Sequence, residues 1–296
     1  MTDIIIFAAY AFLVIIARYM GGFRELHMLQ QNSYQFKSHF NRAIQKGFIS
    51  YIPYVILLLF FLINNTLLCI SSDILGALFL IVAPVIVIII NRPKKFKKPF
   101  VYTARVKRMI VTFTIITLIP LAVAVISFLK GRFGTAFITL TVILCFTPIA
   151  ALLSNLINYP IEEYIRRWYI NDAKKILSGM KSLDIVGITG SYGKTSMKFY
   201  LGELLNSQYN TLITPESYNT PMGVVKTIRM MMKSTHEIFV CEMGARHVGD
   251  IKELCDIVNP HVAIITSIGP QHLETFGKIE NIISTKFELG DAVNGK

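Results

Sequence analysis

Residues 187–198, GITGSYGKTSMK, have the pattern of a loop that holds nucleotide phosphates. The apolar run LDIVGIT before them predicts a buried strand, and the residues after them have helical spacing. Glycines in the loop let the backbone curl so that its N–H groups face phosphate oxygens, and the following helix adds its dipole. Lys194 is placed to reach the β- and γ-phosphates, and the Thr195 hydroxyl to ligate Mg²⁺. The predicted nucleotide site comprises Thr189, Gly190, Ser191, Tyr192, Gly193, Lys194, Thr195 and Ser196.

The loop departs from the usual G-x-x-x-x-G-K-[ST] pattern at one position. Ile188 stands where the first glycine is expected, and Gly187 lies one residue too early. The sequence is therefore a variant, T-G-x-x-G-K-T-S, between a predicted strand and a predicted helix.

Short apolar runs alternate with amphipathic stretches throughout residues 183–296. Strands are expected at 183–189, 210–214, 237–244 and 261–269, with helices at 194–207, 221–234 and 248–258. This alternation predicts βαβ units and a parallel sheet, so the second half is expected to be an α/β P-loop domain. Ligands of such sheets lie beyond the carboxyl ends of the strands, where polar residues follow each of the four runs.

Three stretches together resemble the Mur ligases. GITGSYGKTS (187–196) is similar to the family's ATP loop, T-G-x-x-G-K-T, which also lacks the first glycine. TPESYNTPMGV (214–224) resembles the asparagine–glycine turn of the branch that adds D-alanyl-D-alanine to the peptidoglycan precursor. Residues 241–289, from CEMG through HLETFG to STKFEL, resemble that branch's E-M-G turn, H-x-E-x-F-G turn and K-x-E helix. The resemblance covers about residues 184–289 and implies the central, ATP-binding domain of an ATP-dependent acid–amino-acid ligase.

The resemblance also implies roles for individual residues. Mur ligases phosphorylate a carboxylate with ATP and let an amine displace the phosphate, which requires charge stabilisation and positioning. Two Mg²⁺ ions are expected, with Thr195, Glu242, His272 and Lys286 as the implied metal set. Lys286 matches a lysine that family members carry as a carbamate, and Asn219 matches a polar residue near the γ-phosphate. The implied catalytic residues are Lys194, Asn219, His272 and Lys286.

Three residues whose roles rest on the resemblance, Glu242, His272 and Lys286, also have an ordinary structural interpretation. Glu242 suits a carboxylate that caps a helix at a strand end, His272 a residue of a surface turn, and Lys286 a solvated lysine of a helix. Mg²⁺ prefers oxygen ligands, so His272 rests on the resemblance rather than on its chemistry. Ser267 stands where the family usually has asparagine, a difference that a hydroxyl can compensate by hydrogen bonding.

Residues 1–158 have the composition of a membrane region. Five segments are long and apolar enough to span a bilayer, which takes about 20 apolar residues: 4–20, 49–70, 74–90, 109–129 and 136–157. The first could instead be a signal peptide, although it lacks a basic start and a cleavage site of small residues. No charged residue is expected in mid-span, which argues against an ion path and a transporter.

Basic residues predict the orientation of these spans. Residues 91–108, NRPKKFKKPFVYTARVKR, carry eight Lys or Arg and no acid, and residues 23–48 are also basic. The positive-inside rule places both loops in the cytoplasm, with the N-terminus outside and the ATP domain inside the cell membrane. The net charge of +12 is therefore explained by topology and contact with anionic lipid rather than by nucleic-acid binding. The four cysteines show neither a disulfide framework nor a C-x-x-C metal site.

Residues 159–182 are expected to form an amphipathic linker with aromatic and basic residues interleaved. Such a helix either lies in the membrane interface or packs on the domain that follows. The sequence alone favours neither arrangement.

The leading hypothesis is the front part of a membrane-anchored amide ligase of peptidoglycan precursor synthesis. Its partners would be the precursor, a dipeptide such as D-alanyl-D-alanine, and the bilayer; the sequence does not indicate an oligomeric state. Alternatives are a Mur-like ligase for another amino acid and a non-enzymatic membrane sensor that binds ATP. Residues 1–296 contain no amine-binding domain, so the chain is expected to be either a C-terminally truncated fragment, which is the favoured interpretation, or a degenerate chain, and to show no turnover of its own.

Overall fold

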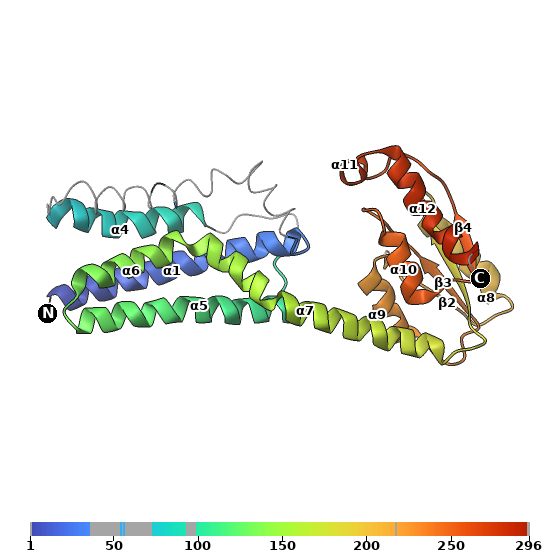
Figure 1. The fold of residues 1–296 in the computed structure, drawn as a ribbon, viewed down its shortest axis with the longest axis horizontal. Helices are drawn as coiled ribbons and strands as arrows, with labels where there is room; N and C mark the ends of the chain where they lie inside the picture. The colour runs from blue at the N-terminus through green and yellow to red at the C-terminus, as the bar shows by residue number, and fades with distance from the viewer. Residues whose placement is uncertain are drawn as a thin grey trace. The chain divides into compact units, whose positions relative to one another are not determined.

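A computed structural model of the chain describes residues 2–35, 54, 56, 73–92, 99–216 and 218–294. The chain divides into two compact units, Met1–Glu162 and Glu163–Lys296 (Figure 1). Each unit is described by itself.

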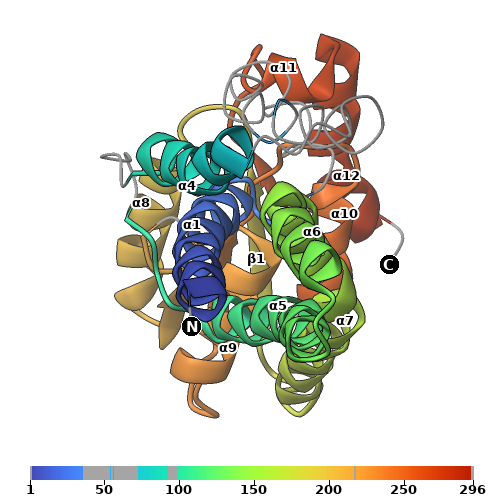
Figure 2. The ribbon, with the colours of Figure 1, turned by 90° about the vertical axis from the view of Figure 1, so that its left-hand side faces the viewer.

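The first unit is built from helices in its described residues. They are α1 (Thr2–Gln31), α4 (Asp73–Ile90), α5 (Ala104–Leu129), α6 (Phe133–Cys145) and the start of α7 (Thr147–Ser178). Helix α1 packs against α4, α5 and α6, and α5 packs against α6 (Figure 2). A core of apolar side chains from these helices, including Phe7, Val87 and Leu140, lies between them. Many other apolar side chains point outward, among them Ile119 and Leu129 on α5, as expected of helices that face lipid.

Several of the five expected spans have a counterpart in these helices. Asp3–Gln31 and Ala104–Leu129 are each long and apolar enough to cross a membrane, and α6 with α7 forms a third candidate if the bent pair is one span. Residues 74–90 fall within α4, an apolar helix of 18 residues. The segment expected at 49–70 lies almost entirely outside the described residues.

The span expected at 136–157 is not one straight helix. It is divided between α6 and α7, which meet at an angle of 67° around Phe146. Pro148 explains the break, because proline has no N–H for an i−4 carbonyl and its ring clashes with that carbonyl. The hydroxyl of Thr147 instead donates a hydrogen bond to the carbonyl of Leu144 at 2.7 Å.

A buried arginine lies among these helices near the end of the first expected span, 4–20, and so is not one of the mid-span charges whose absence was expected. The side chain of Arg18 in α1 is almost fully buried, and its Nε donates to the Thr117 hydroxyl of α5 at 2.7 Å. Its Nη1 donates to the carbonyl of Ile143, close to the bend between α6 and α7. Because a cation is favoured at a helix C-terminus, Arg18 stabilises the end of α6 and ties three helices together.

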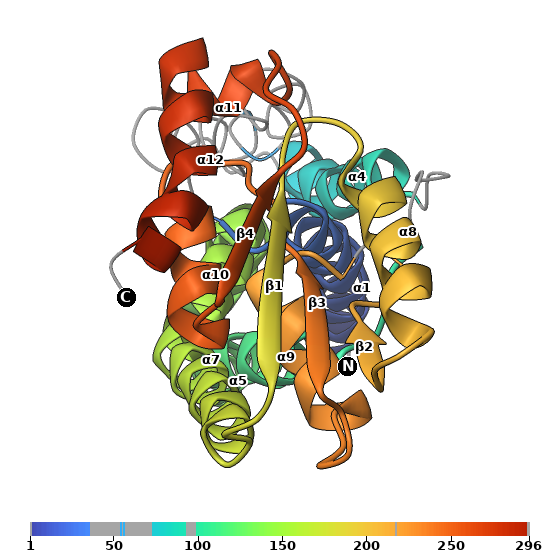
Figure 3. The same cartoon turned by 90° about the vertical axis from the view of Figure 1, so that its right-hand side faces the viewer.

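The second unit contains the predicted parallel sheet. Its strands are β1 (Asp184–Thr189), β2 (Thr211–Ile213), β3 (Ile238–Glu242) and β4 (Val262–Ile265), in the order β2-β3-β1-β4, and every pair is parallel (Figure 3). Their helices are α8 (Lys194–Asn206), α9 (Pro221–Met231), α10 (Asp250–Val258), α11 (Leu273–Phe276) and α12 (Ile279–Asn294). The strand and helix pattern predicted from the sequence is confirmed.

Helices cover both faces of this sheet. Helix α8 packs through Leu201 and Leu205 on one face, against Val186, Ile188 and Val240. A larger core on the other face collects apolar residues of α7, α9, α10 and α12, such as Ala173, Val224, Ile251 and Leu289. The loops that follow the carboxyl ends of the strands form the site described below.

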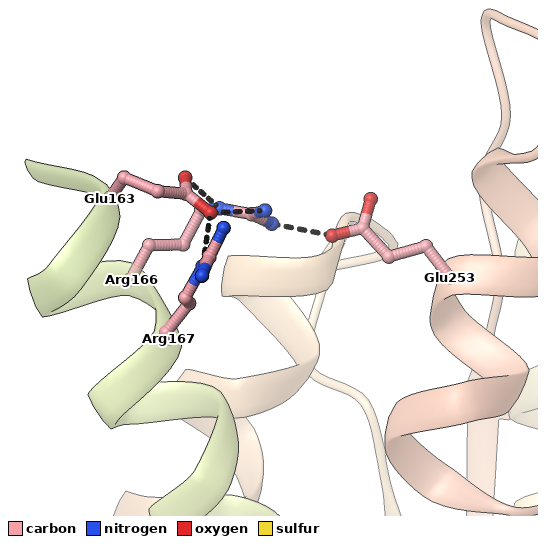
Figure 4. A network of polar contacts seen from close by, with 4 residues as sticks. All are labelled: Glu163, Arg166, Arg167 and Glu253. Carbon is pink, nitrogen blue, oxygen red and sulfur yellow. Dashed lines mark hydrogen bonds and ion pairs between the residues drawn. The ribbon is translucent and has the colours of Figure 1, made fainter. Parts of the chain in front are cut away.

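The predicted linker is the second half of α7, which continues without a break from the first unit to Ser178. Its residues 163–178 belong to the second unit and pack on the rest of it, where Ala173 is fully buried. Arg166 joins Glu163 of the same helix to Glu253 of α10, with Nε–Oε2 and Nη1–Oε1 distances of 2.9 and 2.5 Å (Figure 4). This part of the linker therefore packs on the domain, the second of the two arrangements considered for it.

Candidate functional site

The phosphate loop joins the end of β1, a central strand, to α8. Ile188, at the position of the missing glycine, lies within β1 and is fully buried between β3 and β4. The curl begins only at Gly190, whose φ is +149° and where an added Cβ would lie 2.1 Å from the Thr266 hydroxyl oxygen. A glycine is required at Gly190 but not at Ile188, which explains how the variant motif still forms a tight loop.

Hydrogen bonds fasten the loop to the ends of β3 and β4. The Thr189 hydroxyl donates to the carbonyl of Met243 at 3.0 Å, and the Ser191 hydroxyl donates to the carbonyl of Gly269 at 2.9 Å. The Ser267 hydroxyl accepts from the backbone N–H of Tyr192 at 3.0 Å, so serine does supply a contact at the family's asparagine position. The side chains of Thr189 and Ser191 thus hold the loop rather than face a ligand.

The first turn of α8 supplies the loop's anion-binding groups. The backbone N–H groups of Lys194, Thr195 and Ser196 have no acceptor four residues earlier within the helix, as in any first turn. Gly193 precedes them in the left-handed conformation, with φ of 81°. The Nζ of Lys194 donates to the carbonyls of Gly190 and Ser191 at 2.5 and 3.2 Å, and burial lowers the pKa of this amine. The Lys194 side chain, the backbone amides and the helix dipole therefore all lie at the N-terminus of α8, a position that suits a phosphate.

Glu242, at the end of β3, is the centre of a polar cluster. The Thr195 hydroxyl lies 3.1 and 3.2 Å from its two carboxylate oxygens, and Asn219 Nδ2 donates to Oε1 at 3.0 Å. Lys198 Nζ lies 3.0 Å from Oε2, and the two side chains are 0% and 1% exposed. The backbone N–H of Glu242 donates to the Thr214 hydroxyl at 3.0 Å. The structure thus brings Thr195, Asn219 and Glu242 together as the sequence predicts.

Gly244 in the E-M-G turn allows Asn219 to reach this cluster. A Cβ at Gly244 would lie 2.8 Å from the Asn219 side-chain carbon, and the Gly244 N–H donates to the Asn219 carbonyl at 2.7 Å. The E-M-G turn and the turn that carries Asn219, two separate motifs of the sequence, therefore pack directly against each other.

His272 and Lys286 lie in the electrostatic neighbourhood of Lys194. Burial, with the charge of Lys194 acting in the same direction, lowers the pKa of Lys286 to about 8. Burial also lowers the pKa of His272, with the charges of Arg246 and Lys286 acting in the same direction. Lys286 is 3% exposed, so it is not a solvated helix lysine, and His272 favours the neutral form that a metal ligand needs.

The oxygen donors at Glu242 fit a magnesium ion. One carboxylate and one hydroxyl are hard ligands, and Mg²⁺ usually keeps several waters and takes other ligands from substrate phosphates. Within the described residues, no group of three or more His, Cys, Asp or Glu side chains is arranged to hold a metal. Thr195 and Glu242 therefore form the part of the implied metal set that is assembled by direct contacts.

Lys198 is a site residue that the sequence reasoning missed. Besides its ion pair with Glu242, its Nζ donates to the carbonyl of Glu216 at 2.5 Å, so it connects α8 with β3 and with the turn that carries Asn219. The signal was present, because Lys198 lies one turn before Leu201 and Gly202 on the face of α8 that packs on the sheet. A lysine in the apolar stripe of a helix indicates a buried partner.

The low pKa of Lys286 predicts a pH-dependent stability. Its ordinary pKa of 10.5 applies to the unfolded chain, which therefore binds more protons than the folded chain between pH 8 and 10.5. Burial of the charged Lys286 side chain lowers the free energy of unfolding below pH 8, and this destabilisation disappears as the pH rises to 10.5. In metal-free buffer, urea unfolding should show a rise in stability across this window that is smaller in Lys286→Met. The same rise in the variant would contradict the assignment.

Comparison with known proteins is consistent with this geometry. Residues 188–296 match the family model described as the Mur ligase middle domain. A relative from Bacillus subtilis (strain 168), named UDP-N-acetylmuramoyl-tripeptide--D-alanyl-D-alanine ligase, is 37% identical over 111 residues, which cover 38% of this chain and 23% of the relative. A relative of the same name from Mycobacterium tuberculosis (strain H37Rv) is 36% identical over 121 residues, covering 41% and 23%.

Solved structures also match part of the chain, among them the following two. The crystal structure of MurF from Acinetobacter baumannii has a TM-score of 0.42 at 34% identity and covers 43% of this chain and 28% of that one. MurF ligase from Thermotoga maritima in complex with ADP has a TM-score of 0.40 at 39% identity, covering 42% and 29%. The chain spans about a quarter of the length of the curated relatives that it matches. By its sequence, the part of the chain that holds the site, residues 188–296, matches the middle domain of the Mur ligases.

Proposed function

We propose that the chain carries the ATP-binding part of a ligase that joins a carboxylate of a peptidoglycan precursor to an amine such as D-alanyl-D-alanine. The observation that carries the proposal is the cluster around Glu242, next to the phosphate loop. It combines a carboxylate, a hydroxyl and an amide at the carboxyl ends of parallel strands. The names of the relatives support the substrate class, and the match to the middle domain supports the reaction type.

Each residue of the site would have a separate role in such a reaction. The first turn of α8 and Lys194 would bind the nucleotide phosphates, while Thr195 and Glu242 would hold Mg²⁺. The ion, when bound, would neutralise charge on the phosphates. Asn219, fixed by Gly244 and Glu242, would orient the γ-phosphate toward the substrate carboxylate. An amine would then displace phosphate from the activated carboxylate. His272 is proposed as a ligand of a second ion.

Lys286 is proposed to carry a carbamate. As an ammonium it lies buried near the charge of Lys194, and conversion to an anion removes that repulsion. The predicted outcome of Lys286→Ala is a loss of ligase activity that short carboxylic acids partly restore, because they supply an anion in the vacated space. Activity assays with and without such acids measure the effect. Unchanged activity in Lys286→Ala would refute the carbamate.

We further propose that residues 1–158 anchor the protein in the cell membrane, with the second unit in the cytoplasm. Three observations support this placement: the two candidate spans, the exposed apolar side chains of α5 and the basic composition of residues 91–108. Anchoring would bring the ligase close to precursors that are linked to lipid.

The test is an assay of ADP release with precursor peptides and D-alanyl-D-alanine. It is run on the chain and on the complete product of the reading frame that contains it. ADP release that requires D-alanyl-D-alanine is the expected result for the complete product. Release only with another amino acid would replace the proposal by a ligase of different specificity. ATP binding without release under any condition would favour the membrane sensor.

A further inference from the structure

An apolar pocket of about 600 Å³ lies in the first unit, between α1, the end of α4 and the residues that precede α5. Its walls are aromatic: Tyr19 and Phe23 of α1, and Phe100 and Tyr102. Phe100 holds the wall together through edge-to-face contacts with Phe23 and Tyr102, with ring centroids 6.2 and 5.0 Å apart. A pocket of this size can take the headgroup and the first part of the chains of an amphiphile.

The charged side chains that line the pocket are arginines, and a histidine lies beside them. Arg24, His27 and Arg92 contribute to its surface, and no Asp or Glu is among its lining residues. Arg24 is held in place, since its Nη1 donates to Asn91 Oδ1 at 3.1 Å, and Asn91 Nδ2 donates to Tyr54 and to the carbonyl of Val87. An arginine held by a buried amide is a pre-oriented partner for an anionic group.

The position of the pocket along the helices matches the depth of a lipid headgroup. It lies at the end of α4 where the basic run of residues 91–108 begins, the side that the positive-inside rule assigns to the cytoplasm. Aromatic side chains are enriched at that depth, and basic pockets between membrane helices on the cytoplasmic side bind anionic lipid headgroups. An apolar wall with a basic rim fits a phosphate joined to hydrocarbon better than it fits a fully polar anion.

We propose that this pocket binds an anionic glycerophospholipid of the cytoplasmic leaflet. Its phosphate contacts Arg24 and Arg92, and the start of its chains lies along Tyr19, Phe23 and Phe100. The bound lipid links α1, the end of α4 and the residues before α5. The inference rests on the membrane placement proposed above and goes beyond the proposed ligase activity.

Native mass spectrometry of the full chain tests this site. The protein is reconstituted in nanodiscs of phosphatidylcholine with a minority of phosphatidylglycerol, and the lipids that remain bound after release are identified. The wild-type protein should retain phosphatidylglycerol in preference to phosphatidylcholine. Arg92→Gln should weaken this preference about fivefold, and Arg24→Gln with Arg92→Gln about 30-fold, at about 1 kcal/mol for each arginine.

Two further variants separate the site from general effects. Met20→Trp fills the pocket without changing its charge and should reduce retention of phosphatidylglycerol. Arg132→Gln removes an exposed arginine from the turn between α5 and α6, away from the lining residues, and should leave retention unchanged. Circular dichroism establishes that each variant keeps its helices.

The outcomes that overturn the proposal are distinct from failure of the proposed function. Equal retention of phosphatidylcholine, an unchanged preference in the double arginine variant, or preference for an added polyprenyl phosphate would each refute this assignment. Recovery of the protein from cells without detergent would refute the membrane placement itself. Ligase activity is measured separately and does not enter this readout.

Discussion

Replacement of Lys198 by methionine is expected to lower the free energy of unfolding of the second unit by about 3–5 kcal/mol. Methionine fills much of the space of the lysine side chain but leaves the carboxylate of Glu242 buried without its counter-ion. An uncompensated buried charge costs far more than the loss of an exposed ion pair. The carbonyl of Glu216 also loses its donor, so the turn that carries Asn219 is loosened at the same time.

The only tryptophan of the chain makes this measurement specific. Trp168 lies in the part of α7 that packs on the second unit, with its ring centroid 5.1 Å from that of Tyr169 and 5.2 Å from Arg229 Cζ. Its fluorescence during urea unfolding of the full chain in micelles therefore reports on residues 163–296. Lys175→Met, which changes an exposed lysine of the same helix, is the control and should shift stability by less than about 0.5 kcal/mol.

A double-mutant cycle separates the ion pair from the packing of the lysine stem. Glu242→Gln with Lys198→Met replaces both charges by neutral side chains of similar size. It should be more stable than Lys198→Met alone, because the penalty for the unpaired carboxylate disappears. Equal destabilisation by the single and double changes would show that Lys198 acts through packing only. Full stability in Lys198→Met would contradict the buried ion pair itself.

The fold of the second unit could be predicted because its determinants are local. Each strand is a short apolar run, and each helix has an apolar stripe, so the alternation alone indicates a parallel sheet. The rule that carboxyl ends of parallel strands share one edge predicted where the site lies, whereas Thr195 was identified by the loop motif, and Asn219 and Glu242 by the resemblance to Mur ligases. Lys198 was missed because its partner lies 44 positions away in the sequence, and a lysine in a helix is usually solvated.

The first unit shows the limit of hydropathy. Residues 136–157 are predominantly apolar, so hydropathy gives no sign of the bend at Phe146, which depends on Pro148 and on the hydroxyl of Thr147. Arg18 lies near the end of the first expected span, 4–20, so the expected absence of charge in mid-span says nothing of its burial. Its burial depends on Thr117 and on the end of α6, which are distant in sequence. Hydropathy sums over single residues, whereas these features depend on pairs.

Replacement of Lys194 by alanine should weaken ATP binding about 10- to 100-fold, as measured by equilibrium dialysis with a labelled nucleotide. A hydrogen bond to a charged group contributes about 1.5–3 kcal/mol, and every 1.4 kcal/mol is about tenfold in affinity. Lys194 also donates to the carbonyls of Gly190 and Ser191, so its loss releases the loop that presents the amides of the first helical turn.

A change at Lys194 should act on binding and leave the fold intact. The side chain is only partly buried and makes no ion pair of the kind that joins Lys198 to Glu242, so unfolding followed by Trp168 should be nearly unchanged in Lys194→Ala. Lys278→Ala, which removes an exposed lysine from the turn before α12, is the matched control and should bind ATP as the wild type does. Wild-type affinity in Lys194→Ala would exclude residues 189–196 as the phosphate site, because the lysine is their one positively charged side chain. Loss of affinity in both lysine variants would instead indicate a general effect of net charge on an anionic ligand.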